Sequence, residues 1–162
     1  MKRFQQLLQS LFLCMFLFVL LSGCKEQSSV AALELFSGER GMNFTDGEIL
    51  FTEDTYRRID RDSYALIHVR YSDASIAERV SESGDWKPLP LAESLNTFVY
   101  GPTDARLEIP VVLNGYYYFE DRHEEALDPY DESFLLDRLP YNFTIAIYDI
   151  DKDVLYFCRY DN

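Results

Sequence analysis

The sequence has few basic residues, and this shortage excludes two classes of partner. It contains 15 lysines and arginines against 28 aspartates and glutamates, which gives a formal net charge of −13 at pH 7. Nucleic-acid binding depends on Lys and Arg side chains that neutralise phosphates. Attraction to anionic lipid headgroups depends on a polybasic segment. Because the chain has no basic stretch, we expect no nucleic-acid partner and no charge-driven binding to anionic lipid.

Histidine is also scarce, and the residues around the two histidines do not form a catalytic motif. A hydrolytic triad needs a base beside a nucleophile, and the chain has no G-x-S-x-G turn for either His68 or His123 to serve. The H-E-x-x-H zinc motif is incomplete because Leu127 stands four residues after His123. We therefore expect no enzyme. An enzyme that uses two carboxylates facing each other across a cleft, as glycosidases do, is kept as one functional alternative.

The first two dozen residues have the pattern of an export signal. Lys2 and Arg3 precede an uninterrupted apolar run, residues 11–21, which is too short to span a bilayer. The motif Leu21-Ser22-Gly23-Cys24 resembles the lipobox of bacterial lipoproteins, which has an aliphatic residue, two small residues and a cysteine. The resemblance implies cleavage before Cys24, acyl chains on Cys24 and attachment to a membrane of the cell envelope. Lys25 follows the cysteine, where aspartate marks retention in the inner membrane of Gram-negative bacteria, so the resemblance implies the outer membrane in such a host.

These features divide the chain into a signal peptide (1–23), a lipidated N-terminus and tether (24–35) and one globular acidic domain (36–162). Cleavage removes Lys2 and Arg3 but no acidic residue, so the net charge falls from −13 to −15. All 12 tyrosines lie after the signal, and so many aromatic residues argue against disorder. Cys158 becomes the only free thiol, which excludes an intramolecular disulfide. Its apolar neighbours predict a buried residue.

Strand signals occur throughout the globular part. Residues 142–148 and 154–160 are rich in β-branched and aromatic residues and flank the acidic sequence DIDKD, which predicts a hairpin. Residues 63–71 predict a strand with Ala65, Ile67, Val69 and Tyr71 on one face and His68 on the other. Asn114-Gly115 and Asp46-Gly47 each predict a hairpin with a type I′ turn. Pro110 would place the strand before Asn114 at a sheet edge.

Helix signals are fewer and shorter. Residues 75–84 begin with a capping-box pattern, Ser75 and Glu78, and end at Gly84. Residues 91–98 and 131–140 predict two more short helices. The sum favours an α+β fold in which hairpins build a mainly antiparallel sheet that two or three short helices cover. An all-β sandwich is the alternative.

Asp149, Asp151 and Asp153 alternate in the last predicted turn and resemble the opening of a calcium-binding EF-hand loop. The later positions depart from that loop, because Val154 replaces its glycine and Tyr160 replaces its bidentate glutamate. The other interpretation is a solvated hairpin turn that favours Asp for local backbone hydrogen bonds. Calcium therefore enters as an alternative ligand.

An acidic segment beside the tyrosine run gives the main functional hypothesis. Residues 120–137 contain eight carboxylates, which only Arg122 and the adjacent Arg138 compensate, and Tyr116-Tyr117-Tyr118-Phe119 precedes them. Tyrosine beside carboxylates suits a protein interface. It also suits a sheet covered on both faces, and the segment itself also suits a solvated loop. The leading hypothesis is a non-catalytic envelope lipoprotein whose acidic domain binds a protein, and the negative charge favours a basic partner. The candidate contact residues are Tyr116, Tyr118, Glu124, Glu125, Asp128 and Asp131.

Overall fold

The described residues form one six-stranded antiparallel sheet with short helices on both sides. The computed structural model describes residues 29–55, 63–73, 75–101 and 107–161. The strands are β1 (Glu48–Asp54), β2 (Ser63–Arg70), β3 (Lys87–Pro88), β4 (Gly115–Asp121), β5 (Asn142–Asp149) and β6 (Val154–Asp161). Their order across the sheet is β1-β2-β6-β5-β4-β3. The predicted α+β class is confirmed.

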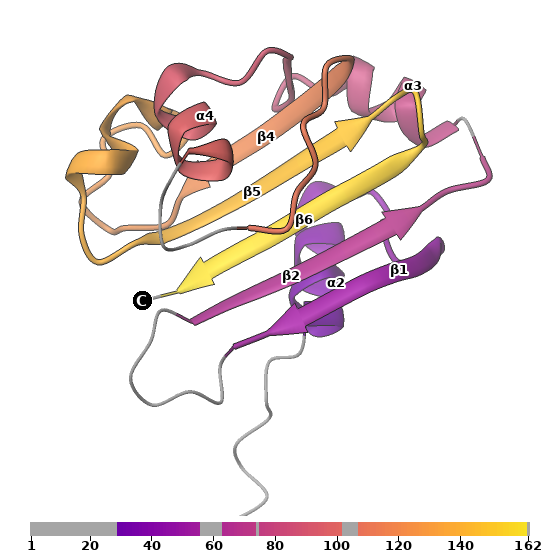
Figure 1. The fold of residues 1–162 in the computed structure, drawn as a ribbon, viewed down its shortest axis with the longest axis horizontal. Coiled ribbons are helices and arrows are strands. Elements are labelled where there is room, and N and C mark those ends of the chain that lie inside the picture. Colours follow the sequence, from indigo (N-terminus) through magenta and orange to yellow (C-terminus); the bar gives the residue numbers. More distant parts are fainter. Residues whose placement is uncertain (1–28, 56–62, 74, 102–106, 162) are drawn as a thin grey trace, which may run out of the picture.

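Helices and an extended segment cover the sheet in two layers (Figure 1). Helix α2 (Ser29–Arg40) lies behind the sheet in that view. Helix α4 (Glu93–Tyr100) and the segment 107–114, drawn in dark orange, lie in front of it. The remaining helices are α3 (Ser75–Glu82) and the 3-10 helix η1 (Glu132–Asp137). The sheet therefore has a hydrophobic core on each face.

The last hairpin was predicted correctly and forms the centre of the sheet. β5 and β6 pair antiparallel from Asn142–Asp161 to Asp149–Val154. Along β5, Phe143, Ile145 and Ile147 face one core, while Ala146 and Tyr148 face the other. The alternation of side chains thus separates two cores rather than a core from solvent. The predicted strand at 63–71 is likewise confirmed as β2, with Ala65 and His68 on opposite faces.

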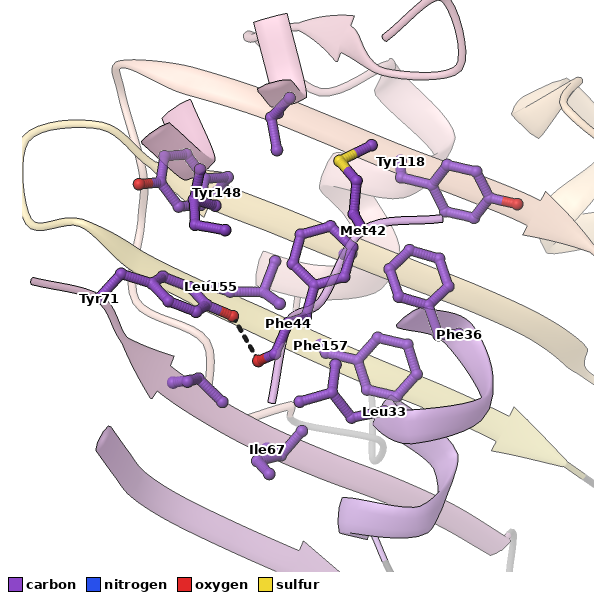
Figure 2. Packing of buried hydrophobic residues seen from close by; sticks show 14 of the residues in the cluster. Leu33, Phe36, Met42, Phe44, Ile67, Tyr71, Tyr118, Tyr148, Leu155 and Phe157 are labelled. Atoms are coloured by element: carbon purple, nitrogen blue, oxygen red, sulfur yellow. Dashed lines mark hydrogen bonds between the residues drawn. The ribbon is translucent and has the colours of Figure 1, made fainter. Parts of the chain in front are cut away.

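The core behind the sheet requires a correction to the predicted tether, because residues 29–35 belong to helix α2. Leu33 and Phe36 of α2 are buried against the sheet. Figure 2 shows them packed with Phe44 and Phe157. Gly41 ends the helix in a left-handed conformation (φ 63°), with the Met42 amide donating to the Ser37 carbonyl at 3.1 Å. This is the Schellman arrangement that glycine favours.

The predicted hairpin at Asn114-Gly115 is wrong. Residues 109–113 form no strand, because Ile109 and Val112 instead pack across the front of the sheet. Gly115 has φ 152°, and a side chain there would place Cβ 1.9 Å from the carbonyl oxygen of Tyr148. Glycine is therefore needed for close approach to the neighbouring strand, not for a type I′ turn. The prediction that Pro110 lies in an edge strand is wrong as well, because it depended on this hairpin.

The predicted hairpin at Asp46-Gly47 is also wrong. Residues 42–46 form no strand, and β1 pairs only with β2. Phe44 lies in the core behind the sheet, where its carbonyl accepts a hydrogen bond from the Tyr71 hydroxyl at 2.7 Å (Figure 2). Burial of this aromatic ring holds the chain over the face of the sheet, so it cannot pair beside β1.

The predicted helices are found with altered ends. Helix α3 is confirmed, but its first turn is held by Asp73, whose carboxylate accepts from the Ser75 amide at 2.9 Å and from the Ser75 hydroxyl at 2.7 Å. Ser75 therefore contacts Asp73 in an Asx-type turn before the helix, rather than forming the predicted capping-box bonds with Glu78. The helix predicted at 91–98 is α4. The one predicted at 131–140 is the shorter η1, which Asp131 caps by accepting from the Ser133 amide at 2.9 Å.

Candidate functional site

The tyrosine run of β4 contributes to the core more than to the surface. Tyr118 is completely buried, and Tyr116 is half-buried against the same cluster. The Tyr118 hydroxyl donates to the Glu120 carboxylate at 2.6 Å, and the Arg40 guanidinium lies 5.0 Å from the ring centroid. Burial, followed by the bond to Glu120, raises the pKa of Tyr118. The prediction that Tyr118 contacts a partner is therefore wrong, and the alternative of a sheet covered on both faces is confirmed.

The carboxylates of the acidic segment differ in position. Glu124, Glu125 and Asp128 are exposed, and Asp131 is half-buried. Asp128 Oδ1 accepts from the Tyr130 amide at 2.9 Å, a turn contact like the cap that Asp131 makes at η1. The hydrogen bonds from Ser133 lower the pKa of Asp131. Asp128 and Asp131 line a groove, whereas Glu124 and Glu125 lie outside its lining.

This groove, of about 660 Å³, lies between the first half of α4 and residues 128–136. We call it the α4 groove. Its lining carries four carboxylates and one basic residue, so it is strongly acidic; the charged residues are Glu93, Asp128, Asp131, Glu132 and Lys87. Tyr130 and Leu136 add apolar surface to the lining and remain exposed. Acidic and apolar side chains therefore meet in one open depression.

An ion pair between the half-exposed Lys87 and the buried Glu132 forms part of the lining of the α4 groove. Lys87 Nζ lies 2.5 Å from Glu132 Oε2 and donates to the Tyr130 carbonyl at 2.9 Å. Glu132 Oε1 accepts from the Tyr117 hydroxyl at 2.9 Å. Burial, together with the bond and charge of Glu132, raises the pKa of Tyr117, which stays a neutral donor. Lys87 thus compensates the charge of Glu132. It forms no ion pair with the other three carboxylates of the lining.

No protein-family model, curated protein or solved structure matches this chain. Function is therefore inferred from the α4 groove and the residues around it. In the part of the chain that the structure describes, no helix has both the length and the apolar character to cross a bilayer.

Further exposed apolar residues lie near the lining residues 128–136 in the sequence but outside the lining itself. Leu127, Phe134 and Leu139 are exposed on the same segment. Single exposed apolar residues are common on protein surfaces. The hydrophobic and acidic features of this region thus occur together.

A second charged cluster fixes the acidic segment to the sheet. The buried Asp121 carboxylate contacts the Arg138 guanidinium and lies 2.5 Å from His123 Nδ1. His123 Nε2 lies 2.7 Å from the Pro140 carbonyl, so each ring nitrogen has a polar partner within the protein. Burial alone would raise the pKa of Asp121, but the bonds and charges of His123 and Arg138 lower it. His123 therefore has a structural role, because its two ring nitrogens contact Asp121 and the Pro140 carbonyl.

The aspartates of the last hairpin have partners within the protein. The buried Asp149 accepts from the amides of Asp151 at 3.0 Å and Lys152 at 3.2 Å, and its Oδ2 lies 2.9 Å from Lys152 Nζ. Asp151 accepts from the Asn114 amide side chain at 2.7 Å, and Asp153 accepts from the Tyr148 hydroxyl at 3.1 Å. No group of three or more His, Cys, Asp or Glu able to hold a metal occurs among the described residues. The geometry gives these aspartates roles in the turn.

Two further groups that could carry chemistry have packing roles, His68 partly buried and Cys158 buried. His68 lies between the rings of Phe51 and Tyr156, each with its centroid 4.8 Å away, and burial lowers the pKa of His68. Cys158 is completely buried, and burial raises the pKa of its thiol. The thiol is therefore protonated and inaccessible, in line with the sequence-based prediction of a buried residue.

The sequence indicated two residues of the α4 groove. Asp128 and Asp131 were predicted as contact residues, but Lys87, Glu93 and Leu136 were not. Lys87 reaches Glu132 across 45 positions because β3 pairs beside β4. A two-residue strand ending in proline gives no periodic pattern that would reveal this contact.

Proposed function

We propose that this chain is a lipid-anchored protein of the bacterial envelope whose acidic domain binds another protein and catalyses no reaction. The lipobox pattern supports the anchor, with Cys24 as the acylated residue. Two or more acyl chains attach a protein stably to a membrane. Lys25 favours the outer membrane where the host has one.

The observation that carries the binding function is the α4 groove with the apolar residues in and near it. Charged residues are usually depleted at the centre of protein interfaces, while aromatic and apolar residues are enriched there. Tyr130, Phe134 and Leu136 provide the apolar part, and the carboxylates of the lining provide a charged rim. Such a rim gives specificity and faster association with a partner of opposite charge.

The packing roles of the described histidines and of Cys158 support binding rather than catalysis. His123 is held by Asp121 and Pro140, and His68 is enclosed by aromatic rings. A general base must reach the proton that it removes from a substrate. None of these side chains lines the α4 groove.

The anchor is tested by expressing the full chain and its Cys24→Ser variant in a bacterium that processes lipoproteins. An alkyne analogue of palmitate should label the natural chain, which should sediment with membranes. The variant should lose both the label and the sedimentation. A labelled Cys24→Ser protein would contradict acylation at this cysteine.

The binding function is tested by a photo-crosslinking residue placed at Ser133, an exposed position in the lining of the α4 groove. The matched control places it at Glu34, an exposed position of α2 behind the sheet. We expect a discrete protein adduct from position 133 in intact cells and none from position 34. The absence of an adduct at 133, or the same adducts from both positions, would contradict a protein-binding face at the groove.

A further inference from the structure

The charge of the α4 groove is unbalanced in a specific way. Its single lysine, Lys87, is bound to Glu132 and to the Tyr130 carbonyl. Asp128 and Asp131 each use Oδ1 to hold the local backbone, and each carboxylate has a second oxygen that can accept from a cation. Together with Glu93, they present three carboxylates that Lys87 does not pair. The complementary group on a ligand is a Lys or Arg side chain.

The apolar part of the lining lies within the same depression. Tyr130 and Leu136 are both exposed, although each belongs to a residue type that gains free energy on burial. A ligand that carried only positive charge would leave them in water. An apolar side chain next to the cationic one would cover them.

The charge of the domain argues against a second copy as the occupant. A second chain without the signal peptide would bring a net charge of −15 toward an acidic groove, and like charges brought together oppose association. A bare metal ion is a poor occupant as well. No suitable group of ligands occurs in the described part of the chain, and an ion would not cover Tyr130 or Leu136.

We infer that the α4 groove receives a segment of a protein partner in which a Lys or Arg side chain stands beside an apolar side chain. The cationic group pairs with Asp128 and Asp131, and the apolar group packs on Tyr130 and Leu136. The Lys87–Glu132 pair stays intact in the lining. This inference rests on the proposed function and specifies the chemistry of the partner.

The experiment measures binding of three short fluorescent peptides to the full-length lipoprotein in nanodiscs of phosphatidylcholine, with empty nanodiscs as the blank. The peptides alternate lysine with leucine, lysine with glycine, and glutamate with leucine. We expect the lysine–leucine peptide to bind most tightly and to weaken as salt rises, because exposed charges are screened. Equal binding of the lysine–leucine and lysine–glycine peptides would overturn the apolar part. Equal binding of the glutamate–leucine peptide would overturn the cationic part.

Matched variants separate the groove from the general acidity of the segment. Asp128→Asn with Asp131→Asn removes two charges from the lining while keeping the backbone hydrogen bonds. Glu124→Gln with Glu125→Gln removes two charges from the same segment outside the lining. We expect the first pair of substitutions to weaken binding of the lysine–leucine peptide by about tenfold, and the second pair to weaken it by less than about threefold. Equal losses would mean that net charge, not the groove, attracts the peptide, and would overturn the inference.

The apolar contact has its own pair of variants. Leu136→Ala should weaken binding of the lysine–leucine peptide. Leu127 is exposed but lies outside the lining, so Leu127→Ala should leave binding unchanged. The crosslink from position 133 separates this inference from the proposed function. If the cellular adduct persists in the Asp128→Asn, Asp131→Asn protein and no peptide binds, protein binding stands and the basic–apolar chemistry is wrong. If the peptide binds as expected but no adduct forms in cells, the proposed function is wrong.

Discussion

Two regions of this protein are rich in carboxylates, and the structure uses them differently. In the turn of the last hairpin, Asp149, Asp151 and Asp153 each accept a hydrogen bond from a neighbour within the fold. In the acidic segment, Asp121 and Glu132 are buried in ion pairs, while Glu124 and Glu125 are exposed. A count of acidic residues therefore does not separate carboxylates that stabilise the fold from those available to a partner.

Asp121→Asn should produce the largest effect, because it removes a buried charge from between Arg138 and His123. Removing one partner of a buried ion pair costs about 3 kcal/mol, since the remaining charges lose their compensation. We expect this loss in the free energy of unfolding of residues 24–162 carrying Cys24→Ser. The measurement follows the fluorescence of Trp86, the single tryptophan.

Glu124→Gln is the matched control, three residues away on the same segment and exposed. Its effect on the free energy of unfolding should stay within about 0.5 kcal/mol. Equal losses for the two variants would contradict the division of this segment into buried and available carboxylates.

Asp149→Ala should have the next largest effect. The variant loses an acceptor for the amides of Asp151 and Lys152 and the ion pair with Lys152. Leaving these groups without their acceptor should cost about 2 kcal/mol. Asp151→Ala, which removes only the exposed bond to Asn114, should cost less than about 1 kcal/mol. The reverse order in chemical denaturation would show that Asp149 does not hold the turn.

The sequence allowed the central strands to be predicted, because β2, β5 and β6 are runs of β-branched and aromatic residues. It misled at Asn114-Gly115 and Asp46-Gly47, where local turn chemistry was outweighed by burial of Ile109, Val112 and Phe44. Helix α2 was missed although Ala32, Leu33 and Phe36 have helical spacing, since the expected tether covered its first half.

The α4 groove was harder to predict than the strands. Local sequence predicted the exposed position of Asp128, since acidic residues in turns face solvent. The approach of Lys87 and Glu93 to residues 128–136 depends on the register of β3 against β4 and on the packing of α4 beside η1. Contacts this distant along the chain leave no periodic signal in a single sequence.

Acidification should produce a smaller loss of stability than Asp121→Asn. The pKa of Asp121 is lowered in the folded state, so its contribution is complete above the unfolded-state pKa and is lost as pH falls through the folded-state pKa. Stability should therefore decline below about pH 4. Protonation of exposed carboxylates relieves mutual repulsion and offsets part of this decline.

The test of this pH dependence is chemical denaturation of the natural and Asp121→Asn domains across the acidic range. The slope of unfolding free energy against pH should be flatter in the variant, because one of the linked carboxylates is absent. Parallel curves would assign the acid sensitivity to other groups with lowered pKa values, such as Asp73 and Asp131.

Calcium should have the smallest effect on the last hairpin. A specific site would add about 2.7 kcal/mol to the free energy of unfolding at a calcium concentration 100 times its dissociation constant. Asp149, which would supply a central ligand, is instead buried against two amides and Lys152, and a calcium ion would have to displace the ammonium group. Melting curves in EDTA, calcium and magnesium at matched ionic strength should therefore coincide. A melting temperature that rises with calcium alone, and no longer rises in Asp149→Ala, would mean that the turn binds calcium. The contrast between the two acidic regions would then no longer hold.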